Sequence, residues 1–154
     1  MACNAPSIRT VTAMADALFV LGYEGTDGQV ADFAAWLAKR QAADLLVVHV
    51  IEWSPYAFLT PEELAERHKV RQAELQGAEQ RILAPLLARL RTDGINATGE
   101  VRHGKPVDVL CAIARDRNAQ LIIAGRSNAL SERVFGGVAS GLSQCASVPV
   151  VIVP

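Results

Sequence analysis

The sequence has few of the residues that mark several common classes of protein. Only three of its 154 residues are cysteines, Cys3, Cys111 and Cys145. An odd number without Cys-x-x-Cys spacing indicates neither a disulfide framework nor a zinc site. Cys111 and Cys145 fall on predicted helices among apolar neighbours, so we expect both to be small buried residues without a metal or redox role.

Excess positive charge is also missing. Fifteen Lys and Arg residues face sixteen Asp and Glu residues, which gives a net charge of −1. The basic surface that nucleic acid requires is therefore not expected. The first sixteen residues contain an apolar stretch, but only Arg9 precedes it and Asp16 interrupts it. We expect no signal peptide, no membrane span and a cytoplasmic location.

Catalytic and metal-binding patterns are equally scarce. The three histidines, His49, His68 and His103, do not share metal-ligand spacing. The sequence has no Gly-x-Ser-x-Gly segment and no paired carboxylates in a glycine-flanked cleft. We therefore assign no metal ligand and no catalytic residue, and we expect the protein not to be an enzyme.

Apolar segments that alternate between strand-like and helix-like periodicity make up most of the chain, of which 51% is hydrophobic. Strands are predicted over residues 17–21, 44–51, 96–103, 121–124 and 150–153, with helical periodicity between them. This alternation predicts one α/β domain over residues 1–154, with a five-stranded parallel sheet, doubly wound, and helices on both faces. Residues 1–16 form an N-terminal extension, and the first strand starts at about residue 17.

A long helix is predicted from Thr60 to about Arg91. Thr60, Pro61 and Glu63 have the spacing of a capping box with proline in the first turn. Gly77 weakens the helical pattern and Pro85 is expected to kink it. The more polar strand over residues 96–103 is expected near an edge of the sheet.

The segment from Leu121 onward contains the strongest indication of a binding site. A buried strand ends at Gly125, a polar loop follows, and Gly136 and Gly137 open a helix whose first amides are free to bind a phosphate. In doubly wound sheets, ligands bind at the carboxyl ends of the strands where the strand order reverses. The segments that follow Leu21, Val50 and Ala124 therefore form the candidate site.

Four segments in order carry a family resemblance. They are VLGYEGTD from Val20, VVHVIE from Val47, VRHGKPVDVLCAIARDRNAQLIIAGRS from Val101, and the ending PVVIV. Together they resemble universal stress proteins of the UspA-like superfamily. The resemblance implies strand order 3-2-1-4-5 and a homodimer paired through the last strand, Val150 to Val153. An apolar strand at the end of a chain otherwise leaves a free edge, although helices that cover its side chains are the alternative.

Nucleotide-binding members of the family carry Gly-x2-Gly-x9-Gly-Ser/Thr after the fourth strand, and here the motif is degraded. Gly125 and Gly136 occupy the first and third glycine positions, whereas Asn128 replaces the second. The spacer of residues 129–135 has seven residues instead of nine, and Gly137 stands where the hydroxyl belongs. Lost hydrogen bonds to phosphate weaken binding by about 1.5–3 kcal/mol each.

Three functions remain open. The first is a regulatory stress-response module that binds AMP, or ATP with Mg²⁺, without appreciable turnover, and signals through its dimer surface to an unknown protein partner. The second is an interaction scaffold with a vestigial loop, and the third is a slow ATPase that uses Glu24. The residues expected at a nucleotide are Gly22, Glu24, Val50, Ala124, Gly125, Arg126, Asn128, Gly136, Gly137 and Val138.

Two further groups of residues have more than one interpretation. Arg126 and Arg133 lie in or near the glycine loop, either as phosphate ligands or as ordinary surface arginines. Trp53, Tyr56 and Phe58 lie within one short loop, as a lid over the site, a dimer contact or part of the core.

Overall fold

The computed structural model describes residues 17–52, 59–126 and 137–154. The predicted N-terminal extension, the loop with Trp53, Tyr56 and Phe58, and Asn128, Arg133 and Gly136 of the glycine loop lie outside the described residues.

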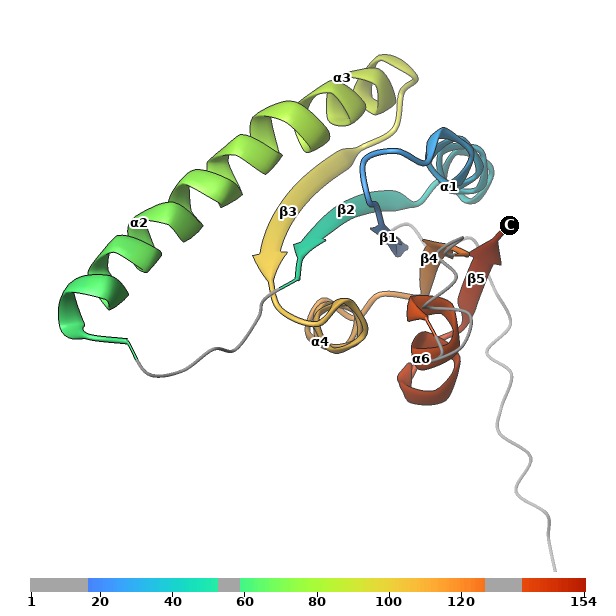
Figure 1. The fold of residues 1–154 in the computed structure, drawn as a ribbon. Helices are drawn as coiled ribbons and strands as arrows, with labels where there is room; N and C mark the ends of the chain where they lie inside the picture. The colour runs from blue at the N-terminus through green and yellow to red at the C-terminus, as the bar shows by residue number, and fades with distance from the viewer. Residues whose placement is uncertain (1–16, 53–58, 127–136) are drawn as a thin grey trace, which may run out of the picture.

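Five parallel strands form one sheet in the order β3-β2-β1-β4-β5, which confirms the expected α/β class and strand order (Figure 1). The strands are β1 (Leu18–Gly22), β2 (Asp44–Ile51), β3 (Ala97–His103), β4 (Leu121–Gly125) and β5 (Val150–Val153). Central strand β1 pairs with both β2 and β4. The polar strand β3 lies at one end of the sheet, as its composition predicts.

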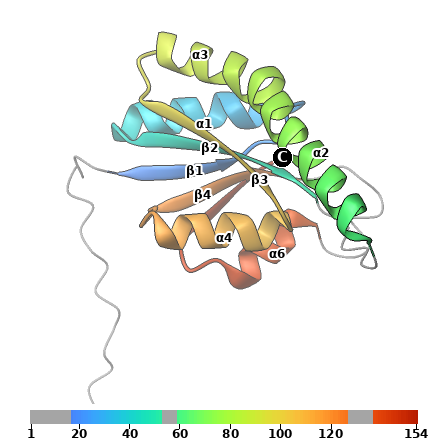
Figure 2. The ribbon, with the colours of Figure 1, turned by 90° about the vertical axis from the view of Figure 1, so that its left-hand side faces the viewer.

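Helices cover both faces of the sheet (Figure 2). One face carries α1 (Gly28–Gln41) and a long helix composed of α2 (Pro61–Ala78), a π-helical segment (Glu79–Leu83) and α3 (Ala84–Thr92). The opposite face carries α4 (Pro106–Asp116) and α6 (Val138–Cys145). Right-handed crossovers between parallel strands place the helices in this way.

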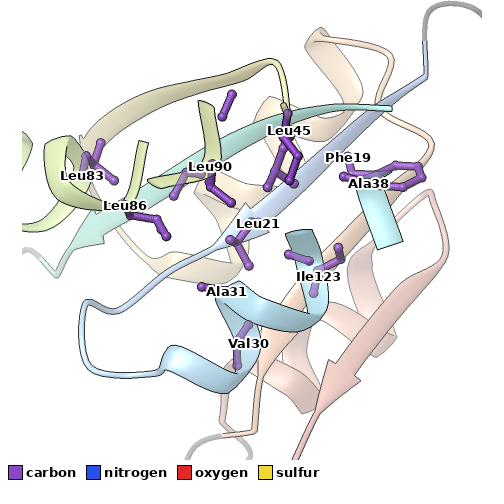
Figure 3. Packing of buried hydrophobic residues seen from close by; sticks show 14 of the residues in the cluster. Phe19, Leu21, Val30, Ala31, Ala38, Leu45, Leu83, Leu86, Leu90 and Ile123 are labelled. Carbon is purple, nitrogen blue, oxygen red and sulfur yellow. The ribbon is translucent and has the colours of Figure 1, made fainter. Parts of the chain in front are cut away.

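The sheet separates two hydrophobic cores. Leu21, Leu45 and Ile123 point to the side of α1 and α3, where Leu86 and Leu90 meet them (Figure 3). Val20 and its neighbours on the next strands point to α4 and α6. Adjacent residues Val20 and Leu21 are both fully buried although they face opposite sides, which explains why β1 has a continuous apolar run rather than an alternating one.

The long helix begins with the predicted capping box. The backbone N–H of Glu63 donates to Thr60 Oγ1 at 3.3 Å, and the backbone N–H of Thr60 donates to Glu63 Oε2 at 2.7 Å. A π-helical segment directly precedes α3, where Pro85 lies in the first turn. Proline has no N–H, and its ring crowds the carbonyl four residues earlier, so we attribute the wider turn to Pro85.

The expectation that both helical cysteines are buried is wrong for Cys145. Cys111 is half-buried against the core beneath α4, whereas Cys145, the last residue of α6, is exposed. The apolar residues around Cys145 in the sequence do not reveal how little of this last residue of α6 the neighbouring elements cover. No helix within the described ranges has both the length and the apolar character to cross a membrane.

Candidate functional site

A cleft of about 250 Å³ lies at the carboxyl ends of β1, β2 and β4. The strand order reverses between β1 and β4, so the cleft lies at the switch point of the sheet. Its lining comes from the ends of these strands and from the first turns of three helices: Gly22, Tyr23, Glu24, Asp27, Val30, Val48, His49, Val50, Glu52, Pro106, Leu110, Ala124, Gly125, Arg126 and Val138.

Seven of the ten residues expected at a nucleotide line this one cleft: Gly22, Glu24, Val50, Ala124, Gly125, Arg126 and Val138. Gly137 caps α6 in an extended conformation but does not line the cleft. Asn128 and Gly136 lie outside the described residues. The structure thus brings together positions that lie more than 110 residues apart in the sequence.

The floor of the cleft is apolar. Val48, Leu110 and Ala124 are all buried at its base. Gly22 lies close beneath α4: a β carbon there would lie 2.9 Å from Leu110 Cδ1, so the Leu110 side chain would have to shift. Close packing of α4 on the end of β1 therefore shapes one wall.

His49 and Tyr23 join β1 to β2 at the mouth of the cleft. The backbone N–H of Tyr23 donates to the Val48 carbonyl at 2.9 Å, and His49 Nδ1 lies 2.7 Å from the Tyr23 carbonyl oxygen. A carbonyl only accepts, so Nδ1 carries the proton and Nε2 of the neutral ring remains an acceptor. Sequence reasoning missed this pair because the two residues are 26 positions apart.

Asp27 is a second residue that sequence reasoning missed. Its side chain caps α1, with Oδ1 accepting from the backbone N–H of Val30 at 3.3 Å. Its Oδ2 lies 2.6 Å from the position that a β carbon would occupy at Gly125. Asp27 immediately before the helical pattern that starts near Val30 is a sequence signal for this cap.

The charged side chains around the cleft are mostly negative. Glu24, Asp27 and Glu52 contribute three carboxylates, and Arg126 contributes the single guanidinium among the described lining residues. Arg126 is anchored through its backbone N–H, which donates to the Val153 carbonyl at 2.8 Å, while its side chain is exposed. Carboxylates repel a phosphate, so a highly charged ligand needs compensation by a cation.

In the described ranges, no cluster of three or more His, Cys, Asp or Glu residues has the arrangement of a metal site. The polar groups of the cleft are instead placed to donate and accept hydrogen bonds around an apolar floor. The site can therefore hold a flat, partly apolar molecule with hydroxyl or amino groups at its rim.

The fold and the cleft define a doubly wound α/β protein with a ligand site at its switch point. The sequence model of the Universal stress protein family matches residues 18–154, so the chain belongs to this family. No curated protein sequence matches the chain significantly.

Solved structures of universal stress proteins share the fold. The universal stress protein UspA from Lactobacillus plantarum superposes with a TM-score of 0.74 at 22% identity, over 90% of this chain and 97% of that protein. A universal stress protein in complex with cAMP superposes with a TM-score of 0.66 at 21% identity, over 89% of this chain and 95% of that protein. The universal stress protein from Archaeoglobus fulgidus in complex with dAMP superposes with a TM-score of 0.62 at 19% identity, over 92% of this chain and 100% of that protein.

Proposed function

We propose that the protein is a regulatory stress-response module that binds an adenine nucleotide, with AMP preferred to ATP, and does not turn it over. The observation that carries this proposal is the convergence of seven expected residues on one cleft at the switch point. Two structurally similar members of the family were solved with cAMP and dAMP, ligands that share the adenine base and one phosphate with AMP.

The size of the cleft supports a small ligand. At about 250 Å³ it is smaller than the range of about 300–1,000 Å³ that is common for sites that hold drug-sized molecules. A base and a ribose are suited to this space, with the base against Val48, Leu110 and Ala124. The phosphate then lies toward Gly125 and Val138, at the end of β4 and the start of α6.

The charge of the cleft supports a monophosphate over a triphosphate. Each additional phosphate charge is repelled by the carboxylates of Glu24, Asp27 and Glu52 and attracted by the guanidinium of Arg126. At separations of several ångströms near a protein surface, each such pair changes the binding energy by a few kcal/mol at most. We therefore expect ATP to require Mg²⁺, which offsets its own charge.

Calorimetry with AMP, ATP and ATP with Mg²⁺ tests the proposal. We expect AMP to release heat, ATP alone to bind more weakly, and Mg²⁺ to restore part of the ATP affinity. The variant Val50→Glu places a further carboxylate in the cleft and should abolish binding. Thr98→Glu is the matched control, because it adds the same charge at an exposed position near the opposite end of β3.

We also propose a homodimer that pairs through β5. In the described part of the chain β5 pairs only with β4. The Pro149 carbonyl accepts from Ile122 of β4, and the Val153 carbonyl accepts from Arg126 directly after β4. Strand alternation therefore leaves the peptide groups of Val150 and Ile152 at the outer edge. All four residues of β5 remain half-buried, and an unpaired apolar edge favours pairing with a second copy.

The scaffold with a vestigial loop is the second candidate. The three carboxylates of the cleft and Gly137 in place of a hydroxyl favour it. It predicts an intact dimer with no heat from any adenine nucleotide. A slow ATPase would instead release phosphate, and Glu24→Gln should then abolish that release. The cytoplasmic location stays a prediction that cell fractionation would test.

A further inference from the structure

Helices α4 and α6 pack closely against each other on one face of the sheet. Each helix connects two parallel strands of the same sheet through a crossover, α4 from β3 to β4 and α6 from β4 to β5, so the two helices run in the same direction. Gly141 of α6 lies directly against α4. A β carbon there would lie 2.6 Å from Cγ2 and 3.3 Å from Cγ1 of Val107 on α4.

The two helical cysteines lie one turn beyond this contact. Cys111 is four residues after Val107, and Cys145 is four residues after Gly141. Residues four apart in a helix lie on the same face. Because the helices are parallel and in contact at Val107 and Gly141, the next turn of each brings Cys111 and Cys145 opposite one another.

Electrostatics provides independent support for this pairing. Burial raises the pKa of the Cys111 thiol, the negative charge of Cys145 raises it further, then that of Asp108, and Arg115 lowers it. An effect of Cys145 on Cys111 requires that the two sulfur atoms lie near each other. Both thiols are free in the structure.

We propose that Cys111 and Cys145 are an oxidation site, which a hydroperoxide converts to an intrachain disulfide between α4 and α6. Such a bond requires Cα atoms about 4.4–6.8 Å apart, a separation suited to two helices that touch at a glycine. The site does not depend on nucleotide binding.

The oxidation proceeds in two steps. Cys145 is exposed and reacts first: its thiolate attacks one peroxide oxygen, the O–O bond breaks, and a sulfenic acid and one water result. The Cys111 thiolate then attacks the sulfenyl sulfur, the S–O bond breaks, and the departing hydroxide takes a proton to give a second water. In total, two thiols lose two protons and two electrons, and hydrogen peroxide is reduced to two waters.

Order and rate follow from the surroundings of each thiol. Half-buried Cys111 is the resolving residue, and its raised pKa keeps it protonated at neutral pH. The second step is therefore slow at pH 7 and accelerates as the pH rises. The bond joins the two helices that contribute Pro106, Leu110 and Val138 to the cleft.

Intact-protein mass spectrometry of a Cys3→Ser variant treated with hydrogen peroxide tests the proposal. We expect the folded monomer to lose the mass of two hydrogen atoms, to yield a peptide that links positions 111 and 145, and to regain its mass with dithiothreitol. The rate should increase with pH and fall in concentrated urea, because the native packing holds the thiols together.

Single-cysteine variants in the same background are the controls. With Cys111→Ser, Cys145 has no partner and should gain oxygen atoms instead of losing hydrogens. With Cys145→Ser, oxidation of Cys111 should be slow. The proposal is overturned if the two-cysteine protein gains oxygen without a linked peptide, forms only disulfide-linked dimers, or crosslinks as fast in urea as in the folded state.

Discussion

The carboxylate of Asp27 lies directly against the backbone of Gly125, with Oδ2 2.6 Å from the position of an added β carbon. This contact joins the start of α1 to the end of β4, across the mouth of the cleft. Cγ2 of Val30 lies 2.9 Å from the same position. A side chain at position 125 would therefore collide with the side chains of Asp27 and Val30.

Alanine at Gly125 should destabilise the fold by about 1–3 kcal/mol, the usual cost of overpacking. The added methyl group displaces Asp27 from its cap on α1. Asp27→Ala alone should cost about 0.5–2 kcal/mol, because the cap is lost. Since both changes disturb the same cap, the double variant should lose less stability than the sum of the two. Urea unfolding of all four proteins measures this coupling, and strictly additive losses would contradict the contact.

The variant Asp27→Asn removes the negative charge of Asp27 but keeps a side chain that can cap α1. Asparagine caps helices about as well as aspartate, so the fold should keep its stability. Loss of the negative charge should strengthen ATP binding on the order of tenfold at low salt, with little effect on adenosine. Calorimetry at two salt concentrations checks this, because screening should reduce the gain. An equal gain for adenosine would show that Asp27 does not act through its charge.

Most of the fold could be predicted because buried strands leave a strong signal. The expected bounds of the strand at 44–51 and of the last strand agree with the structure. The first strand differs by one residue at both ends, and the third and fourth strands differ by one residue at one end. Val20 and Leu21 illustrate the reason: a strand buried on both faces is apolar at consecutive positions. The π-helical turn before Pro85 was missed, because hydrogen-bond spacing inside a helix leaves no comparable pattern.

The candidate site was predictable only in part. Gly22, Val50 and Ala124 could be assigned because each lies at the end of an apolar strand, and strand ends converge in this fold. The pairing of His49 with Tyr23 depends on the register between β1 and β2, which no local pattern reveals. Exposure of Cys145 likewise depends on how the end of α6 packs against its neighbours, which the local sequence does not show.

Ile152→Pro tests the proposed edge of the dimer. The N–H of Ile152 points away from β4, so proline removes a hydrogen bond between subunits without breaking the β4–β5 ladder. Ile152→Ala is the matched control, because both variants lose the side chain that packs against the core. Light scattering after size exclusion should give a dimer for Ile152→Ala and a monomer for Ile152→Pro. If both variants were monomers, or both were dimers, pairing through this edge would be ruled out.

The pKa of Cys111 predicts a pH dependence of stability. Its thiol has a raised pKa in the folded protein, mainly because burial disfavours the thiolate. This group therefore contributes stability that is fully present below the thiol pKa of the unfolded chain, about 8.5. The contribution is lost as the pH rises through the higher pKa of the folded protein.

Under reducing conditions, the free energy of unfolding should therefore decline above this pH. The decline should be smaller in Cys111→Ala, whose remaining titratable groups are unchanged. Chemical denaturation at several pH values measures the difference. Parallel pH profiles of the two proteins would show that Cys111 titrates alike in the folded and unfolded states.

Amide chemical shifts of the ¹⁵N-labelled protein during addition of AMP test the central claim most directly. The account predicts saturable shifts at the strand ends that surround the cleft, at Gly22, Val50 and Ala124, and no change at Thr98 on the far end of β3. A spectrum that stays unchanged at millimolar AMP, or shifts confined to residues away from the cleft, would contradict it.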